Sequence, residues 1–307
     1  MNNKPNFFIV GAAKSGTSSL WQYLKGHPEI FMPEDELYKE PRHFSHPGRF
    51  PTEDDYLQLF AAAQSQHKRI GEASTAYLTH PDCAGKIFQF QKDNNLDVKI
   101  IILLRNPVNR AYSMYNWMAQ EGYEYSATFG KALKREKKRI HKMSKFWEPN
   151  YYYNYLYFNS GLYTEQVNRY FETFGRENVY VGVFEEFTKN TAGMLKEILQ
   201  FLEVDPNYSP DVSKVYNPSY KIIHPGLQFL LRWSNKILSR FNIVKFTNKK
   251  ERDRLLQIGY TKQKTPPQKD EIKRELAKAY EADIRKLEIL INKDLSIWLN
   301  AVKAKKE

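Results

Sequence analysis

The chain has 307 residues and carries 47 lysines and arginines against 35 aspartates and glutamates, a formal net charge of +12. This excess favours an anionic partner such as a nucleotide, an acidic polysaccharide, nucleic acid or a membrane surface, although exposed lysines on an ordinary surface explain it equally well. The lone Cys83 excludes an internal disulfide, and no apolar run is long enough for a membrane-spanning helix or a secretory signal, so we expect a cytoplasmic protein.

The first part of the chain alternates between strand and helix patterns. Residues 98–104 form an almost unbroken apolar run rich in β-branched side chains, which is typical of a strand buried on both faces. Thr52 and Asp55 resemble a helix capping box. We expect strands at 6–10, 69–72 and 98–104, and helices at 17–25, 54–63 and 82–91. The alternation predicts an α/β fold of three layers, similar to P-loop proteins, with a central parallel β-sheet flanked by helices.

The composition changes after Gly122. Residues 131–145 are strongly basic, and residues 146–158 are crowded with aromatic side chains that could either pack in a core or line an acceptor site. Residues 236–264 are basic and could form a lid or a solvated loop. We expect helices at 131–145, 161–174, 191–202 and 270–290, a strand at 179–184, and a loop at 206–225.

The segment Gly11 to Ser18 predicts an anion-binding loop. It follows an apolar strand and opens a helix, so free backbone N–H groups and the helix dipole point toward the turn. A Walker A loop would carry its lysine directly after the second glycine, where this chain has Thr17 instead. The lysine lies earlier, at Lys14. Such a loop should bind a nucleotide without needing a triphosphate and magnesium.

A second cation follows the buried strand at 98–104. A Walker B strand would end in an aspartate that holds Mg²⁺, whereas this strand is followed by Arg105, a phosphate-binding group. Ser113, on the helix that follows, could offer a hydroxyl to the same phosphate. Because ligands of such folds bind at the carboxyl ends of the strands, we expect Lys14 and Arg105 to share one site. Glu72, at the end of another strand, is the candidate general base.

With these residues the chain resembles the sulfotransferases that use 3′-phosphoadenosine 5′-phosphosulfate (PAPS), in particular the bacterial and heparan-sulfate branch. Residues 11–18 resemble the 5′-phosphosulfate loop, and residues 104–113 resemble the 3′-phosphate motif. Residues 71–77 resemble the segment that holds the glutamate base. Residues 39–44 are similar to a K-E-P-H-F-F element, and residues 272–298 are similar to a closing helix and tryptophan.

The resemblance implies that one sulfotransferase domain covers residues 1–307. Its PAPS-binding core would span about 5–122 and 176–203, and its acceptor-side elements about 123–175 and 204–307. PAPS would be the co-substrate and adenosine 3′,5′-bisphosphate the product, with no metal, because a lysine can replace a metal clamp on a sulfuryl group. We found no counterpart of a late loop that contacts the 3′-phosphate, for which Lys262 or Lys264 could substitute. The absence of a membrane anchor fits a soluble bacterial-type enzyme, for which a homodimer is one candidate assembly.

The resemblance also implies a role for each candidate residue. Lys14 and Glu72 would be catalytic, and His43, Tyr77 and Trp117 would contact the acceptor, a saccharide or a small metabolite with a hydroxyl or an amine. The donor would be bound by Lys14, Ser15, Gly16, Thr17, Ser18, Arg105 and Ser113. Two rival interpretations are a P-loop nucleotide kinase, which would hydrolyse ATP with magnesium, and a basic nucleic-acid-binding module, which would bind RNA or DNA with a strong salt dependence.

Overall fold

The computed structural model describes residues 3–33, 39–46, 48–141, 151–212, 221–222, 225–226, 229–230, 232–233, 260–261 and 268–299. The chain forms two compact units. The first consists of Met1–Asn106, Tyr163–Asn217 and Asp283–Asp294. The second consists of Pro107–Leu162, Pro218–Ala282 and Leu295–Glu307. The predicted extent of a single sulfotransferase domain stays a prediction.

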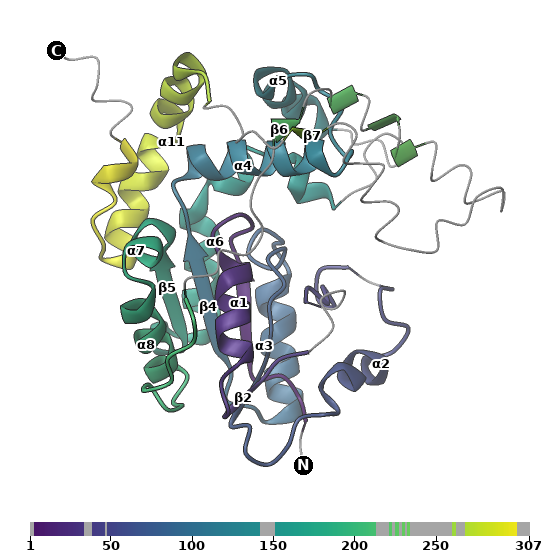
Figure 1. The fold of residues 1–307 in the computed structure, drawn as a ribbon, viewed down its shortest axis with the longest axis vertical. Coiled ribbons are helices and arrows are strands. Elements are labelled where there is room, and N and C mark those ends of the chain that lie inside the picture. The colour runs from purple at the N-terminus through teal and green to yellow at the C-terminus, as the bar shows by residue number, and fades with distance from the viewer. Residues whose placement is uncertain are drawn as a thin grey trace. The chain divides into compact units, whose positions relative to one another are not determined.

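A five-stranded parallel sheet forms the centre of the first unit (Figure 1), which confirms the predicted fold class. Its strand order is β2-β3-β1-β4-β5, and every neighbouring pair is parallel. The strands are β1 (Phe7–Gly11), β2 (Ile30–Phe31), β3 (Arg69–Glu72), β4 (Lys99–Leu104) and β5 (Val179–Val183). All residues of β1, β3 and β4 are buried, as a sheet covered on both faces requires.

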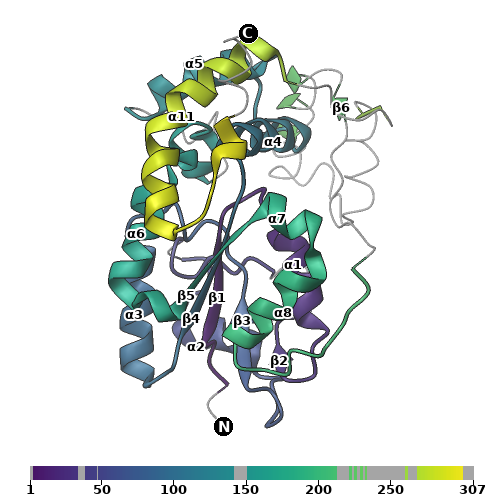
Figure 2. The ribbon, with the colours of Figure 1, turned by 90° about the vertical axis from the view of Figure 1, so that its left-hand side faces the viewer.

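Helices cover both faces of this sheet, so the first unit has three layers (Figure 2). On one face, apolar residues of β1 and β4 join one core cluster with α1 (Thr17–Lys25) and α8 (Thr191–Phe201). On the opposite face lie α3 (Cys83–Asn94) and α6 (Tyr163–Phe174). Successive side chains of a strand point to opposite faces of the sheet, so one apolar run packs against the helices on both faces.

Two short helices of the first unit differ from the expected elements. Helix α2 (Glu53–Leu57) has the predicted capping box between Thr52 and Asp55, but it is shorter than expected and continues as a 3₁₀ turn, Gln58–Phe60. Helix α7 (Phe184–Lys189) was not predicted. It begins at Phe184. The predicted strand included Phe184, but β5 ends one residue earlier, at Val183.

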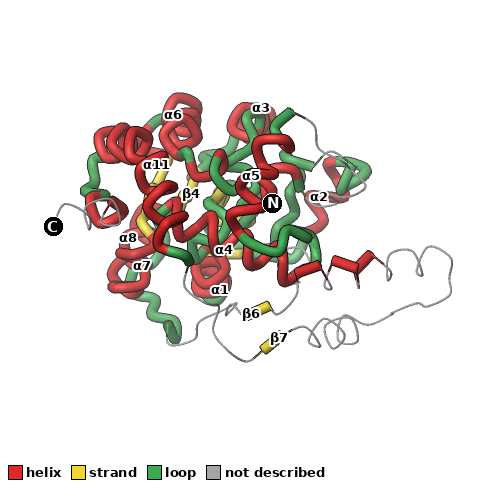
Figure 3. The backbone as a smooth tube through the Cα atoms, turned by 90° about the horizontal axis from the view of Figure 1, so that it is seen from above, coloured by secondary structure: helices red, strands yellow, loops and turns green. Residues whose placement is uncertain are grey.

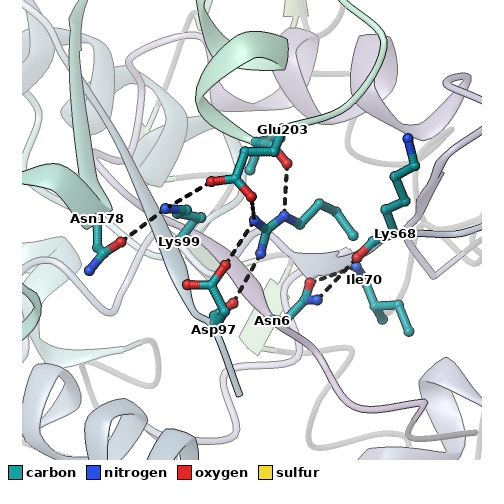
Figure 4. A network of polar contacts seen from close by, with 9 residues as sticks. Asn6, Lys68, Ile70, Asp97, Lys99, Asn178 and Glu203 are labelled. Carbon is teal, nitrogen blue, oxygen red and sulfur yellow. Dashed lines mark hydrogen bonds and ion pairs between the residues drawn. The ribbon is translucent and has the colours of Figure 1, made fainter.

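A polar network lies near the amino ends of β3 and β4 (Figure 4). The buried Arg69 guanidinium donates to the backbone oxygens of Leu202 and Asp97, at 2.8 and 3.0 Å. It also forms ion pairs of 2.9 Å with the carboxylates of Asp97 and Glu203. Lys99 extends the network to Glu203 at 3.4 Å. Arg69 therefore ties the sheet to the C-terminal end of α8.

The second unit contains α4 (Pro107–Gln120), α5 (Phe129–Arg139) and most of α11 (Asp270–Ile291). It also contains 3₁₀ turns at Tyr152–Tyr155, Asn159–Gly161 and Ser296–Leu299. Strands β6 (Lys221–Ile222) and β7 (Tyr260–Thr261) pair antiparallel (Figure 3). Helix α5 begins earlier than the predicted 131–145, because Thr128 caps its first turn. It also ends earlier, at Arg139.

Glu124 organises the interior of this second unit. Its carboxylate is fully buried and accepts hydrogen bonds of 2.8 Å from Arg139 and 2.9 Å from the Tyr157 hydroxyl. Tyr155 and Tyr157 are also fully buried, so these two aromatic residues serve core packing. The predicted lid at 236–264 and the candidates Lys262 and Lys264 lie outside the described residues, apart from β7. None of the helices in the described part of the chain has the length and hydropathy needed to cross a bilayer.

Candidate active site

Three predicted site residues lie at the same edge of the sheet. Lys14 lies in the loop after β1, Glu72 ends β3, and Arg105 follows β4. Strand β1 lies between β3 and β4, and both pairings are parallel. The carboxyl ends of these strands therefore meet at one edge, which is where α/β proteins bind their ligands.

The loop between β1 and α1 has the backbone of an anion-binding turn. Lys14 and Gly16 both have left-handed backbone angles, with φ of 71° and 85°. A side chain at Gly16 would place its Cβ 2.9 Å from the Phe184 ring, so only glycine fits there. No side chain caps α1, and its first turn has no acidic residue. The positive end of the helix dipole is thus available to an anion.

Ser15 adds a polar group to this loop. The residue is fully buried, and among the described residues its hydroxyl oxygen has no hydrogen-bond partner. A buried hydroxyl without a partner is costly, because it has lost its hydration and gained nothing in return. A phosphate or sulfate oxygen bound in the loop would accept this hydrogen bond. The donor set of the loop therefore fits an anionic ligand.

Arg105 is joined directly to this loop. Its Nη1 donates to the backbone oxygen of Lys14 at 3.0 Å, and its guanidinium lies 4.7 Å from the centre of the Phe184 ring. The Tyr163 hydroxyl donates to the Arg105 backbone oxygen at 2.9 Å. The structure thus brings Lys14 and Arg105 together, as the sequence predicted.

Glu72 is fully buried at the end of β3. Neither of its carboxylate oxygens meets a donor at normal hydrogen-bond distance and angle within the described chain. Burial raises the pKa of this carboxyl to about 7, although the nearby hydroxyls of Tyr77, Tyr56 and Ser74 favour its ionised form. The neighbouring negative charge of Glu40 raises the pKa as well. A carboxyl with this pKa can exchange a proton near neutral pH.

Glu40 is a second carboxylate near this edge, and it was not among the predicted site residues. One of its oxygens accepts from Arg42 at 2.8 Å, and the other accepts from the Thr75 hydroxyl at 2.9 Å. Burial opposes its ionisation, but Arg42 and Lys39 hold its pKa below the ordinary value. Its side chain is 22% exposed, so solvent reaches it. The sequence did contain a signal for Glu40, because it lies in the segment 39–44 that is similar to a K-E-P-H-F-F element. We assigned no role to this glutamate from the sequence.

His43 and Tyr77, two of the predicted acceptor-binding residues, both pack against other aromatic side chains. His43 stacks on Tyr56 with the ring centres 4.2 Å apart, and burial together with the Lys86 charge lowers its pKa. Tyr77 is fully buried, and its hydroxyl accepts from the backbone N–H of Phe44 at 3.3 Å. A ligand can touch Tyr77 only if its surroundings move. The contact of either residue with an acceptor stays a prediction.

Ser113 and Trp117 lie on α4, which belongs to the second unit. Both side chains are half-buried, and the Trp117 ring packs against Tyr123 with the ring centres 6.3 Å apart. Their predicted contacts with the 3′-phosphate and the acceptor stay predictions.

Comparison with known proteins identifies the family. The family described as "Sulfotransferase domain" matches residues 4–221. A sulfotransferase structure from Alicyclobacillus acidocaldarius is 31% identical in sequence, with a TM-score of 0.69, and the match covers 96% of this chain and 98% of that one. Among curated proteins, the membrane-associated sulfotransferase kil1 of Dictyostelium discoideum is 32% identical over 117 residues. Mouse carbohydrate sulfotransferase 15 is 24% identical over 255 residues.

The coverage of these relatives differs. The match to kil1 covers 38% of this chain and 23% of that protein, and the match to carbohydrate sulfotransferase 15 covers 66% and 44%. The chain thus spans less than half the length of these two curated relatives. The family match, in contrast, covers most of this chain and includes the loop, Glu72 and Arg105. On these grounds the chain belongs to the sulfotransferase domain family.

Proposed function

We propose that the protein transfers a sulfuryl group from PAPS to a hydroxyl or amine of an acceptor. The observation that carries this proposal is the hydrogen bond from Arg105 to the Lys14 backbone oxygen, which joins two cationic residues before the N-terminus of α1. Glu72 ends a neighbouring strand at the same edge of the sheet. A kinase of similar fold would need a strand-end aspartate for magnesium, where this chain has Arg105.

Different residues of the first unit bind the two ends of the donor. We assign the 5′-phosphosulfate to Lys14, the buried Ser15 hydroxyl and the N-terminal N–H groups of α1, from Gly16 to Ser18. We assign the 3′-phosphate to Arg105, and the contact of Ser113 with the same phosphate stays a prediction from the sequence. The 3′-phosphate distinguishes PAPS from ordinary adenine nucleotides, so this assignment predicts nucleotide selectivity.

The transfer needs one bond to form and one to break. The acceptor oxygen or nitrogen attacks sulfur, and the bond between sulfur and the 5′-phosphate oxygen breaks. The released electron pair remains on that oxygen, in adenosine 3′,5′-bisphosphate. Lys14 would stabilise this negative charge as it develops, which a positioned ammonium can do without a metal ion. The acceptor proton passes to a carboxylate.

Two carboxylates compete for the role of general base. Glu72 is the residue predicted from the sequence, and its pKa of about 7 suits proton transfer near neutral pH. Its complete burial argues against direct contact with an acceptor, unless neighbouring side chains move. Glu40 is partly exposed and ionised, so it accepts a proton less readily but is easier to reach. We keep Glu72 as the assigned base and Glu40 as its rival.

The variants Glu72→Gln and Glu40→Gln distinguish the two, with the exposed Glu53→Gln on α2 as the matched control. Replacing the base should lower kcat by roughly 10²–10⁴-fold and leave the affinity for adenosine 3′,5′-bisphosphate nearly unchanged. If Glu72 is the base, kcat/KM of the wild type should rise with pH up to about 7. A large loss of nucleotide affinity in Glu72→Gln would refute its assignment.

The class of acceptor is a further part of the proposal. The curated relatives include carbohydrate sulfotransferase 15 and heparan sulfate glucosamine 3-O-sulfotransferase 5, which favours a saccharide. Small metabolites remain the alternative, and a cytoplasmic location remains an expectation. A panel of polysaccharide, phenolic, lipid and polyketide-like acceptors, assayed with radiolabelled PAPS, tests this choice. Magnesium-dependent ATP hydrolysis without sulfuryl transfer would favour the kinase instead.

A further inference from the structure

Lys39 reaches the same helix terminus from a different part of the chain. Its ammonium contacts the Ser18 hydroxyl, in the first turn of α1. The ammonium also lies 6.0 Å from the centre of the Trp21 ring, one turn further along the helix. The positive charge of Lys39 contributes to the low pKa of the adjacent Glu40 carboxyl. Lys39 was not among the site residues predicted from the sequence.

This ammonium adds positive charge at a place that attracts anions. The N-terminus of a helix carries about half a positive charge, so a cation is repelled there and an anion is attracted. Helix α1 has no acidic residue in its first turn, and Glu40 is already paired with Arg42 and Thr75. Lys14 brings a further positive charge into the loop before this helix. An anionic group bound at this terminus would be attracted by both lysines and by the helix dipole.

The buried Ser15 hydroxyl is an independent sign of such a ligand, because it lacks a hydrogen-bond partner among the described residues. We propose that Lys39 is a second donor-binding cation, which contacts the 5′-phosphate end of the nucleotide. This inference rests on the proposed function and extends it by one residue. Lys39 binds charge that is present before and after transfer, so it acts mainly on affinity.

The chain supplies a matched control in Lys25. Its ammonium lies 5.2 Å from the centre of the same Trp21 ring, but Lys25 belongs to the last turn of α1. Lys25→Met therefore removes the same charge and the same kind of ring contact as Lys39→Met, at the end of the helix that does not bind anions. Lys39→Arg keeps the charge and should retain most of the affinity.

Isothermal titration with two nucleotides tests the proposal. Adenosine 3′,5′-bisphosphate has the 5′-phosphate, and adenosine 3′-phosphate lacks it. Lys39→Met should bind the bisphosphate about tenfold more weakly than the wild type, because it loses one charge-assisted contact. The same variant should bind adenosine 3′-phosphate as the wild type does. Lys25→Met should match the wild type with both nucleotides.

The possible results separate this inference from the proposed function. Wild-type affinity of Lys39→Met for the bisphosphate would overturn the role of Lys39 and leave the proposed function intact. An equal loss with both nucleotides, or an equal loss in Lys25→Met, would also overturn it, since the effect would not concern the 5′-phosphate. If the wild type bound neither nucleotide, the proposed function itself would fail. Thermal unfolding of each variant shows whether it is folded.

Discussion

Because the Glu72 carboxyl is buried, we expect the folding stability of the protein to depend on pH. Its pKa of about 7 in the folded protein exceeds its ordinary value of 4.5, because burial disfavours the charged form. The folded protein therefore holds this proton more tightly than the unfolded chain does. The stability that the neutral carboxyl provides is present in full below pH 4.5 and is lost as the pH rises toward 7. The difference between the two pKa values corresponds to a loss of roughly 3 kcal/mol.

Glu72→Gln removes this titration and keeps the size of the side chain. We expect the stability of this variant, relative to the wild type, to rise by roughly 2–3 kcal/mol between pH 5 and pH 8.5. Urea unfolding at several pH values measures the change, with Glu53→Gln as the control at an exposed position. A relative stability of Glu72→Gln that does not vary with pH would refute the reasoning. It would mean that the Glu72 carboxyl is not forced toward its neutral form.

Three further substitutions test the fold around the site and in the second unit. Arg69→Met should destabilise the protein by about 3 kcal/mol in urea unfolding, because two backbone oxygens and two carboxylates lose their donor; a loss below about 1 kcal/mol would contradict this role. Gly16→Ala should cost about 1–3 kcal/mol and weaken nucleotide binding, since its φ is 85° and its Cβ would meet Phe184; a variant that binds like the wild type would show that the loop tolerates a side chain. Glu124→Gln should cost about 3–5 kcal/mol, because it removes the negative charge from the buried ion pair with Arg139, and an unchanged midpoint of unfolding would speak against that ion pair.

Local patterns were sufficient to predict much of the fold. Helix α1 and strand β3 have the predicted bounds, because each is delimited by a glycine turn or by a change in polarity. Strand β2 has only two residues, too few for any periodicity to appear, and it was missed. Helix α7 was missed because its first residue, Phe184, continues the apolar run of the preceding strand. Short elements depend on packing against the sheet, which the local sequence does not encode.

The site was predictable where its residues follow strands. Lys14, Glu72 and Arg105 could be placed together because parallel strands bring their carboxyl ends to one edge. Glu40 and Lys39 could not, because they lie on a connecting segment whose position depends on contacts with Thr75 and Ser18. Those contacts join residues 35 and 21 positions apart in the sequence. Nothing in the local pattern reveals which charged residues of a loop return to the site.

Nucleotide binding shows whether the protein uses PAPS as its sulfuryl donor. The decisive measurement is a calorimetric comparison of adenosine 3′,5′-bisphosphate, AMP and ATP, each with and without magnesium. We expect the bisphosphate to bind at least tenfold more tightly than AMP without magnesium, and Arg105→Met to remove most of this preference. Equal affinities for the bisphosphate and AMP, together with tight binding of ATP only when magnesium is present, would contradict it.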